Sequence, residues 1–337
     1  MGTVSSLGVI GWYGQGNAGD DRILHCIRKA LGNRGLLVMS SLEEAEARKA
    51  ELDQCDAVVL GGGGLVLACT NRFADVISTL RPPLVSLGIS VEATGAETEG
   101  LRMAIATKSE LIVVRDHVSS VCFPGRNDVI VAPDLTFLDP LDVQPLTPGG
   151  PVTLNLRPWP TYPSVPVGRL TGRIRRMTHR WPVVSVRVGD SWRSEWIVTI
   201  LRRSRLDIRP CPLCTNVHQD DRTELARFFA NVPGAWSPEL LRDTGWLLGM
   251  RLHSLVFACQ SGLPFVGLDY QPKVREFARM LGLPDMAVPV YGLRGLHRAL
   301  TRVREDYLSL RQQLLDYREK ARDEVERAFR LVRQVIR

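Results

Sequence analysis

The sequence predicts an α/β protein with two doubly wound parallel sheets and a long C-terminal helix. Three observations predict this class. Short apolar runs alternate with amphipathic stretches, a segment rich in proline and glycine interrupts the alternation at 138–151, and a continuous helical pattern begins at about residue 292. A chain of 337 residues is long enough for two domains, each with its own hydrophobic core.

The first part of the chain contains six apolar runs with the length and composition of buried strands. They lie at 7–13, 36–40, 56–60, 84–89, 111–115 and 129–132. Amphipathic stretches lie between them at 20–32, 42–52, 71–80 and 96–107. Because strands and helices alternate in this way in open parallel sheets covered on both faces, we assign residues 1–145 to an N-terminal Rossmann-like domain.

The alternation resumes after the proline-rich segment. The strand candidates are VTLNLR (152–157), VVSVRV (183–188), LDIRP (206–210), WLLGMR (246–251), PFVGLDY (264–270) and AVPV (287–290). We assign residues 152–292 to a second Rossmann-like domain. Residues 293–337 form a C-terminal helical segment with apolar residues at steps of three and four: Leu314, Tyr317, Ala321, Val325, Ala328 and Val332. Two doubly wound domains and a long helix are the plan of the GT-B fold, in which the domains face a cleft.

Composition and cysteine content indicate a globular protein with reduced cysteines. The sequence is 45% hydrophobic and 23% charged, which is typical of globular domains. No stretch is as long as a membrane-spanning helix, and the first residues lack the features of a signal peptide, so we expect a cytoplasmic protein. The seven cysteines are scattered and odd in number, which favours reduced thiols. Cys211 and Cys214 have no second pair at zinc-site spacing, so we expect loop thiols rather than a metal; their role stays open.

The net charge of +7 is mostly arginine, and two basic blocks stand out at 169–180 and 200–209. These blocks fit a solvated helix face. They also fit attraction for an acidic glycan or for the headgroups around a lipid-linked one, so peripheral contact with the inner face of a membrane stays open. Nucleic acid is not an expected partner, because the blocks lack interleaved aromatic residues and match no binding motif for it.

The stretch GWYGQGNAGDD (11–21) contains a G-x-G-x-x-G between an apolar run and a helical pattern, the form of a dinucleotide-binding turn. Such a site needs an acidic residue near the end of the second strand, where GLLVMSS ends in serines. Asp20 and Asp21 also stand where a pyrophosphate would lie and would repel it. We therefore expect no NAD; the glycines instead allow a tight turn that brings Asp20 to the edge of the sheet.

A second glycine run, Gly61 to Gly64 in CDAVVLGGGGL, directly follows the third predicted strand. Core packing does not explain four consecutive glycines. A flexible linker is the plain alternative, but the flanking strand and helix patterns argue against it. We expect the backbone N–H groups of Gly61, Gly62, Gly63 and Gly64 to line a binding site at the carboxyl edge of the sheet.

Four cationic residues and a histidine also follow predicted strands, namely Arg115, Arg157, Arg251, Lys273 and His253. A single arginine at a strand end most often forms a surface ion pair. Together, at the carboxyl ends of strands in both domains, these residues indicate a site for a compact anion with several charges.

These motifs resemble the bacterial polysaccharide pyruvyltransferase family. GWYGQGNAGDD, VVLGGGGL, VVRD, LNLR, GMRLHSLVFACQSGLP and LDYQPKVREF occur in the family's order, from about residue 8 to 280. Asp21 stands where the family often has glutamate. Residues 158–245, which in such enzymes face the acceptor, show no match strong enough to name a substrate.

The resemblance implies transfer of pyruvate from phosphoenolpyruvate onto two hydroxyls of a sugar, which gives a cyclic ketal and releases phosphate. It implies Asp20 and His253 as the catalytic acid and base, in an order that stays open. Substrate-binding residues are then Asn17, Gly19, Gly61, Gly62, Gly63, Gly64, Arg115, Arg157, Arg251, Leu252 and Lys273. Neither a metal nor a cofactor is expected beyond phosphoenolpyruvate as donor, because the cations can carry the phosphate charge.

Two other functions stay open from the sequence. A nucleotide-sugar-dependent glycosyltransferase of GT-B architecture would also place glycine loops and cations at the strand ends. A non-catalytic anion- or glycan-binding relative would retain the same residues. The acceptor could be a glycan polymer, a lipid-linked saccharide or a small metabolite, and the oligomeric state is unknown.

Overall fold

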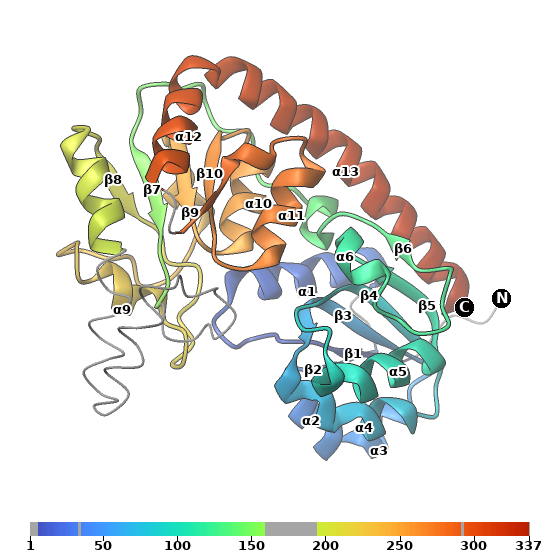
Figure 1. Ribbon diagram of the computed structural model, residues 1–337. Helices are drawn as coiled ribbons and strands as arrows, with labels where there is room; N and C mark the ends of the chain where they lie inside the picture. Colours follow the sequence, from blue (N-terminus) through green and yellow to red (C-terminus); the bar gives the residue numbers. More distant parts are fainter. Residues whose placement is uncertain (1–5, 33–34, 159–193, 291–292, 337) are drawn as a thin grey trace. The chain divides into compact units, whose positions relative to one another are not determined.

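The computed structural model describes residues 6–32, 35–158, 194–290 and 293–336, which separate into two compact units (Figure 1). The first unit contains Met1–Pro140 and Asp316–Arg337, and the second contains Leu141–Leu315. Each unit is built on one parallel sheet with helices packed against it. The predicted class, two Rossmann-like α/β domains with a long C-terminal helix, is confirmed.

In the described part of the first unit, the sheet has six parallel strands in the order β2-β1-β3-β4-β5-β6. They are β1 (Leu7–Ile10), β2 (Leu36–Met39), β3 (Ala57–Val66), β4 (Leu84–Val91), β5 (Ser109–Val114) and β6 (Ile130–Val131). The strand order reverses between β1 and β3, and ligands of open α/β sheets bind outside the carboxyl ends of strands at such a point. The residues that follow β1 and β3 are therefore in the position expected of a binding site.

Helices cover both faces of this sheet (Figure 1). They are α1 (Ala18–Leu31), α2 (Leu42–Ala47), α3 (Lys49–Leu52), η1 (Ala68–Phe73), α4 (Ala74–Ser78), η2 (Ala96–Thr98), α5 (Glu99–Lys108), α6 (His117–Ser120) and η3 (Leu135–Leu138). Helix α1 begins where Asn17 caps it by accepting a hydrogen bond from the Gly19 backbone N–H. Its face of Ile23, Leu24 and Ile27 is buried, as its sequence pattern predicts.

Among the described residues, the sheet of the second unit has five parallel strands in the order β11-β10-β9-β7-β8. They are β7 (Val152–Asn155), β8 (Ile208–Pro210), β9 (Trp246–Gly249), β10 (Phe265–Asp269) and β11 (Ala287–Pro289). Here the order reverses between β7 and β9, whose last residues pair in register, Asn155 with Gly249. The strand predicted at 183–188 and the basic block 169–180 lie outside the described residues.

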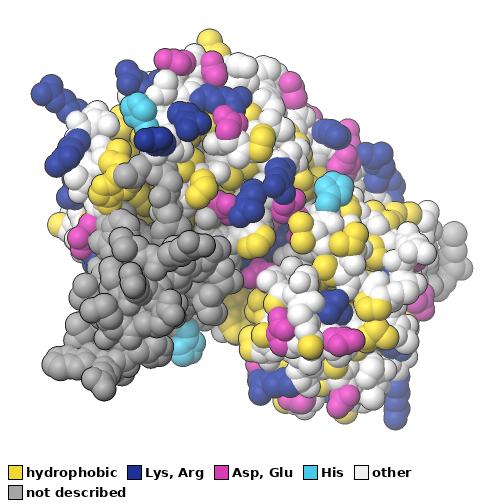
Figure 2. All heavy atoms as spheres, viewed as in Figure 1, with side chains coloured by type: hydrophobic (Ala, Val, Ile, Leu, Met, Phe, Trp, Pro, Cys, Tyr) yellow, Lys and Arg dark blue, Asp and Glu magenta, His cyan; other side chains and the backbone are white. Residues whose placement is uncertain are grey.

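The helices of this unit follow its strands. Residues 194–203 are helical, and the further elements are α9 (Asp221–Leu225), η5 (Pro238–Leu241), α10 (Leu252–Gln260), α11 (Pro272–Met280), η6 (Pro284–Met286) and α12 (Leu293–Glu305). In the basic block 200–209, Arg202 donates to the Phe228 carbonyl at 2.6 Å and Arg209 donates to the Arg242 carbonyl at 3.2 Å. On the face drawn in Figure 2, Lys and Arg side chains are interspersed with Asp and Glu side chains.

The last helix, α13 (Tyr307–Val335), is 29 residues long and passes from the second unit into the first. Within the second unit, the Tyr307 hydroxyl donates to the Gly245 carbonyl at 2.9 Å. Within the first, the rings of Tyr317 and Phe137 meet edge to face at 5.7 Å between centroids. Residues from Asp316 onward thus belong to the first unit, whereas the sequence patterns assign 293–337 to a separate helical segment. No helix among the described residues is long and apolar enough to cross a membrane.

Candidate functional site

The glycine run Gly61–Gly64 lies inside β3, which corrects the expectation that it follows the strand. Gly62 and Gly63 have φ angles of +67° and +85°, in the left-handed region that favours glycine. The pairing of β3 with β4 shifts register between Gly63 and Val66. The strand therefore continues through the run as an irregular segment, which we call the glycine bulge (Gly61–Gly64).

Helix α1 packs directly against the glycine bulge. A Cβ atom built on Gly62 would lie 2.2 Å from Ile23 Cγ2, and one built on Gly63 would lie 2.8 Å from Asp20 Oδ1. Asp20 is only 8% exposed, and its Oδ2 accepts a hydrogen bond from Asn17 Nδ2. The structure thus brings Asn17, Gly19 and Asp20 to the glycine bulge.

Tyr13 supports this arrangement, although the sequence patterns did not single it out. Its hydroxyl donates to the carbonyl oxygen of Gly61 at 2.5 Å, and its ring is buried. Burial raises the pKa of Tyr13 well above its ordinary value, and the charge of Asp20 raises this pKa further. The phenol therefore stays protonated and holds the glycine bulge as a hydrogen-bond donor.

Arg115, the predicted anion ligand of the first unit, lies among carboxylates. It follows β5, its side chain is 5% exposed, and its Nη2 donates to Ser90 Oγ at 2.8 Å. Its Nη1 lies 3.5 Å from Asp134 Oδ2, and its Nη2 lies 4.0 Å from Glu92 Oε1. Glu92 and Asp134 were not among the predicted site residues.

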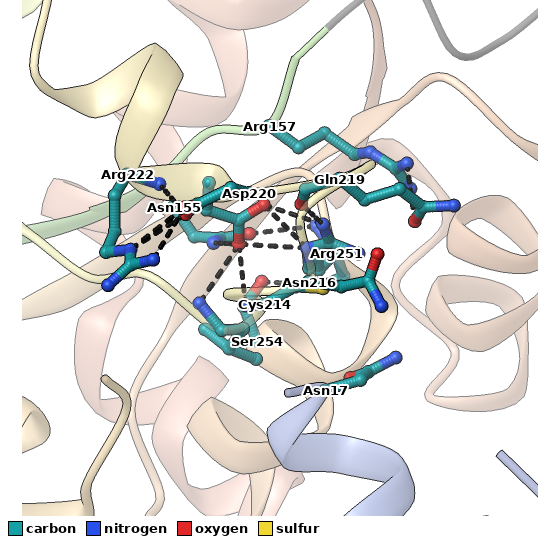
Figure 3. A network of polar contacts seen from close by, with 12 residues as sticks. Asn17, Asn155, Arg157, Cys214, Asn216, Gln219, Asp220, Arg222, Arg251 and Ser254 are labelled. Atoms are coloured by element: carbon teal, nitrogen blue, oxygen red, sulfur yellow. Dashed lines mark hydrogen bonds and ion pairs between the residues drawn. The ribbon is translucent and has the colours of Figure 1, made fainter. Parts of the chain in front are cut away.

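Arg157 and Arg251 come together at the carboxyl edge of the second sheet (Figure 3). Arg157 follows β7, and its Nη2 donates to Gln219 Oε1 at 3.0 Å. Arg251 follows β9, and its Nη2 donates to the backbone carbonyl of the same Gln219 at 2.7 Å. Gln219 therefore connects the two guanidinium groups. Arg157 also donates to the Tyr270 hydroxyl at 3.3 Å and lies over the Tyr270 ring.

Asp221 forms an ion pair with Arg251 and holds its guanidinium group in place. Its fully buried carboxylate accepts hydrogen bonds from Arg251 Nε at 2.8 Å, from the backbone N–H groups of Leu213 and Cys214, and from Asn155 Nδ2. Burial opposes the charge on Arg251, but the Asp221 charge and hydrogen bonds outweigh it and raise the pKa of Arg251. The orientation of Arg251 is thereby set by groups inside this unit.

The two arginines differ in their electrostatic balance. Burial lowers the pKa of Arg157 to about 10, and the positive charge of Arg251 contributes to the lowering. A buried cation whose charged form is disfavoured gains most from a bound anion. The pair therefore combines one guanidinium whose charge is balanced by the protein with one whose charge an anionic ligand would stabilise.

The remaining predicted residues of this unit start the two helices that follow β9 and β10. Leu252 and His253 begin α10, and both are 7% exposed. The His253 ring stacks on Phe257 with 6.0 Å between centroids. Lys273 is the second residue of α11 and is half-buried. As predicted, these side chains follow the carboxyl ends of strands.

Cys211 and Cys214 contribute to the site through their backbones. The Cys211 carbonyl accepts from Asn155 Nδ2 at 2.9 Å, and the Cys214 N–H donates to Asp221 at 3.1 Å. Burial raises the pKa of both thiols. Within the part of the chain that the structure describes, no group of three or more His, Cys, Asp or Glu side chains could hold a metal ion.

With this geometry in place, comparison with known proteins identifies the family. The family model for polysaccharide pyruvyl transferases matches residues 17–200, more than half of the chain. The chain belongs to the polysaccharide pyruvyl transferase family. It is therefore a transferase, and the matched residues include the glycine bulge, Asp20, Arg115 and Arg157. No curated protein sequence matches the chain significantly.

Solved structures with a similar fold include two UDP-N-acetylglucosamine 2-epimerases of low sequence identity. The putative UDP-N-acetylglucosamine 2-epimerase from Listeria monocytogenes has a TM-score of 0.54 and 9% identity, over 96% of this chain and 91% of that one. The UDP-GlcNAc 2-epimerase from Neisseria meningitidis, bound to UDP-GlcNAc, has a TM-score of 0.52 and 10% identity, over 98% and 99%. These likenesses confirm a GT-B-like fold for this member of the pyruvyl transferase family.

Proposed function

We propose that this transferase moves pyruvate from phosphoenolpyruvate onto two hydroxyls of a saccharide, forming a cyclic ketal and releasing phosphate. The observation that carries the proposal is the Arg157–Gln219–Arg251 cluster at the carboxyl edge of the second sheet. Two adjacent guanidinium groups, one of them anchored by a buried carboxylate, suit a ligand with two anionic groups on neighbouring carbons. Phosphoenolpyruvate is such a ligand.

The donor's charges are assigned to Arg157, Arg251 and Lys273. Asp221 and Gln219 engage Nε and Nη2 of Arg251, and no hydrogen bond to its Nη1 occurs within the described residues. Nη1 can therefore donate to a carboxylate or phosphate oxygen of the donor. Arg157 would regain a stable charge beside that anion, and Lys273 supplies a further cation from α11. Leu252 would contribute through its position at the start of α10.

The reaction needs one proton delivered to the donor and two removed from the acceptor. The methylene carbon of phosphoenolpyruvate gains a proton, and two hydroxyl oxygens bond in turn to the carbon that carries the phosphate. One hydroxyl proton balances the proton gained by that carbon, and the other leaves with phosphate. We assign the acid to His253, which lies at the start of α10 close to Arg251 in the chain, and the base to Asp20; the opposite assignment would balance equally.

Asn17, Gly19 and the glycine bulge (Gly61–Gly64) are assigned to substrate binding around Asp20. Asn17 donates a hydrogen bond to the Asp20 carboxylate. The glycine bulge has no side chains that would displace this carboxylate. Arg115, which lies in the same unit as Asp20, is assigned the role of a cation near the substrate. Phosphoenolpyruvate is the donor substrate in this proposal, which requires no further cofactor or metal.

Thermal unfolding in the presence of candidate donors tests the proposal. A ligand at about 100 times its Kd stabilises the folded state by about 2.7 kcal/mol, which is readily measured as a rise in Tm. We expect phosphoenolpyruvate to raise the Tm and UDP-glucose to leave it unchanged. Protection by UDP-glucose alone would favour a glycosyltransferase, and protection by neither would contradict the assignment of the arginine cluster.

A further inference from the structure

Glu92 is a carboxylate that lies at the glycine bulge and has no place in the donor assignment above. It follows β4 directly, and its backbone N–H donates to the Val66 carbonyl at 3.0 Å, at the end of β3. A Cβ atom built on Gly64 would lie 2.0 Å from Glu92 Oε1. Any side chain at position 64 would therefore displace this carboxylate.

The neighbouring glycine accommodates a second carboxylate in the same way. Asp20 reaches Gly63 from α1, whereas Glu92 reaches Gly64 from the end of β4. Two carboxylates from different elements thus meet consecutive residues of one strand. They do so at the carboxyl edge of the sheet, next to the point where the strand order reverses between β1 and β3.

A buried cation connects Glu92 to the glycine bulge. Arg115 lies 4.0 Å from Glu92 Oε1 and donates to Ser90 Oγ, which lies 3.5 Å from the carbonyl oxygen of Gly63. The Arg115 side chain is 5% exposed and the Glu92 side chain 17%, so the carboxylate is the more accessible of the pair.

We propose that Glu92 binds a hydroxyl of the saccharide acceptor, beside the hydroxyl that Asp20 deprotonates. This inference rests on the proposed function, because it assigns the acceptor side of that reaction to the glycine bulge. A saccharide that forms a cyclic ketal presents two hydroxyls, and ionised carboxylates are strong acceptors for both. Arg115 orients Glu92 in this arrangement and acts as a positioning residue.

The variant Glu92→Gln tests the inference because it keeps the shape of the side chain and removes its charge. Initial rates of phosphate release are measured with phosphoenolpyruvate and a panel of p-nitrophenyl galactosides, glucosides and mannosides. We expect the KM for the best glycoside to rise about 10- to 100-fold, since a charge-assisted hydrogen bond is lost. The KM for phosphoenolpyruvate and the Tm shift that it causes should not change.

A matched control lies in the same β4–α5 connection. Glu97 is exposed, and its Oε2 would lie 2.0 Å from a Cβ atom built on Gly95. Like Glu92, it therefore lies directly over a glycine. Glu97→Gln should leave the KM for the glycoside unchanged. If Glu92→Gln does not fold, Glu92→Asp keeps the charge on a shorter side chain and should raise the same KM by a smaller factor.

An unchanged KM for the glycoside in the folded Glu92 variant overturns the inference. So does a loss of phosphoenolpyruvate protection in Glu92→Gln, because it would place Glu92 on the donor side. Failure of the proposed function is a separate result: the wild-type protein would then show neither protection by phosphoenolpyruvate nor transfer to any glycoside. That result would also remove the acceptor role of Glu92.

Discussion

Asp221 holds Arg251 through both oxygens of a fully buried carboxylate. Arg251 Nε lies 2.8 Å from Oδ1 and from Oδ2, and Arg251 Nη2 lies 2.7 Å from Oδ1. The same carboxylate accepts two backbone N–H groups of the segment between β8 and α9. The ion pair therefore fixes the position of Arg251 before any ligand binds, which is the condition for efficient electrostatic stabilisation of a transition state.

Loss of this carboxylate charge should destabilise the protein strongly. Asp221→Asn leaves Arg251 buried without its counter-charge, and we expect a loss of about 3–5 kcal/mol in the free energy of unfolding, measured in urea. Asp220→Asn is the matched control, because Asp220 pairs with the half-exposed Arg222 and asparagine can still cap α9. It should cost less than about 1 kcal/mol. Equal losses in the two variants would contradict the assigned role of Asp221.

Because of Arg157, phosphoenolpyruvate binding should weaken at alkaline pH. Its pKa of about 10 in the free protein is lowered by burial and by Arg251, and a bound anion favours its charged form. The affinity for phosphoenolpyruvate is then greatest below this pKa and decreases as the pH rises through it. Titration calorimetry between pH 8 and 10.5 should show this decrease in the wild type. Arg157→Ala should bind about 10- to 100-fold more weakly and lose that part of the pH dependence; an unchanged profile would exclude Arg157 from the donor site.

The contact between Gly63 and Asp20 should make position 63 more sensitive than other left-handed glycines. Gly14 has a φ of +68° with no atom within 4 Å of a built Cβ, so Gly14→Ala should cost about 1–2 kcal/mol from backbone strain alone. Gly63→Ala adds displacement of Asp20 to the same strain. We expect a larger loss in urea unfolding and a fall in turnover. Matching values for the two variants would show that Asp20 does not depend on the glycine bulge.

The two assigned proton-transfer groups should affect turnover far more than binding. Asp20→Asn and His253→Gln should each lower kcat by about 10²- to 10⁴-fold, the usual contribution of a positioned acid or base. Phosphoenolpyruvate affinity of the Asp20 variant should change little. Exposed residues of the same types serve as controls: Asp21→Asn and His297→Gln should retain activity. A double variant of Asp20 and His253 with wild-type turnover would end the proposed mechanism.

Hydrophobic periodicity predicted the strands because it records local burial. The six strand candidates of the first unit and those at β7 to β11 all correspond to observed strands. The sequence predicts that the glycine run follows the third strand, because glycine usually weakens strands. In the structure Gly62 and Gly63 lie inside β3 and continue it in left-handed backbone conformations. Periodicity cannot indicate such an irregular pairing.

Asp20 and the cations of the candidate site were predictable from the sequence, but the carboxylates that pair with those cations were not. Arg157 and Arg251 follow apolar strands directly, so their position at the sheet edge could be inferred from the chain. Asp221 lies outside every recognised motif, and its contact with Arg251 joins residues 30 positions apart. The only signal for it was general: a buried arginine needs a counter-charge, but the chain has many acidic residues to choose from.

The most direct test follows the pyruvyl carbon itself. Phosphoenolpyruvate labelled with carbon-13 at C2 is incubated with the protein and the best p-nitrophenyl glycoside, and the products are observed by carbon-13 NMR alongside an assay of free phosphate. The account predicts that the label becomes a ketal carbon bonded to two sugar oxygens, with one phosphate released per ketal formed. Label that remains in phosphoenolpyruvate, or that appears only in free pyruvate, across the whole panel of glycosides would contradict it.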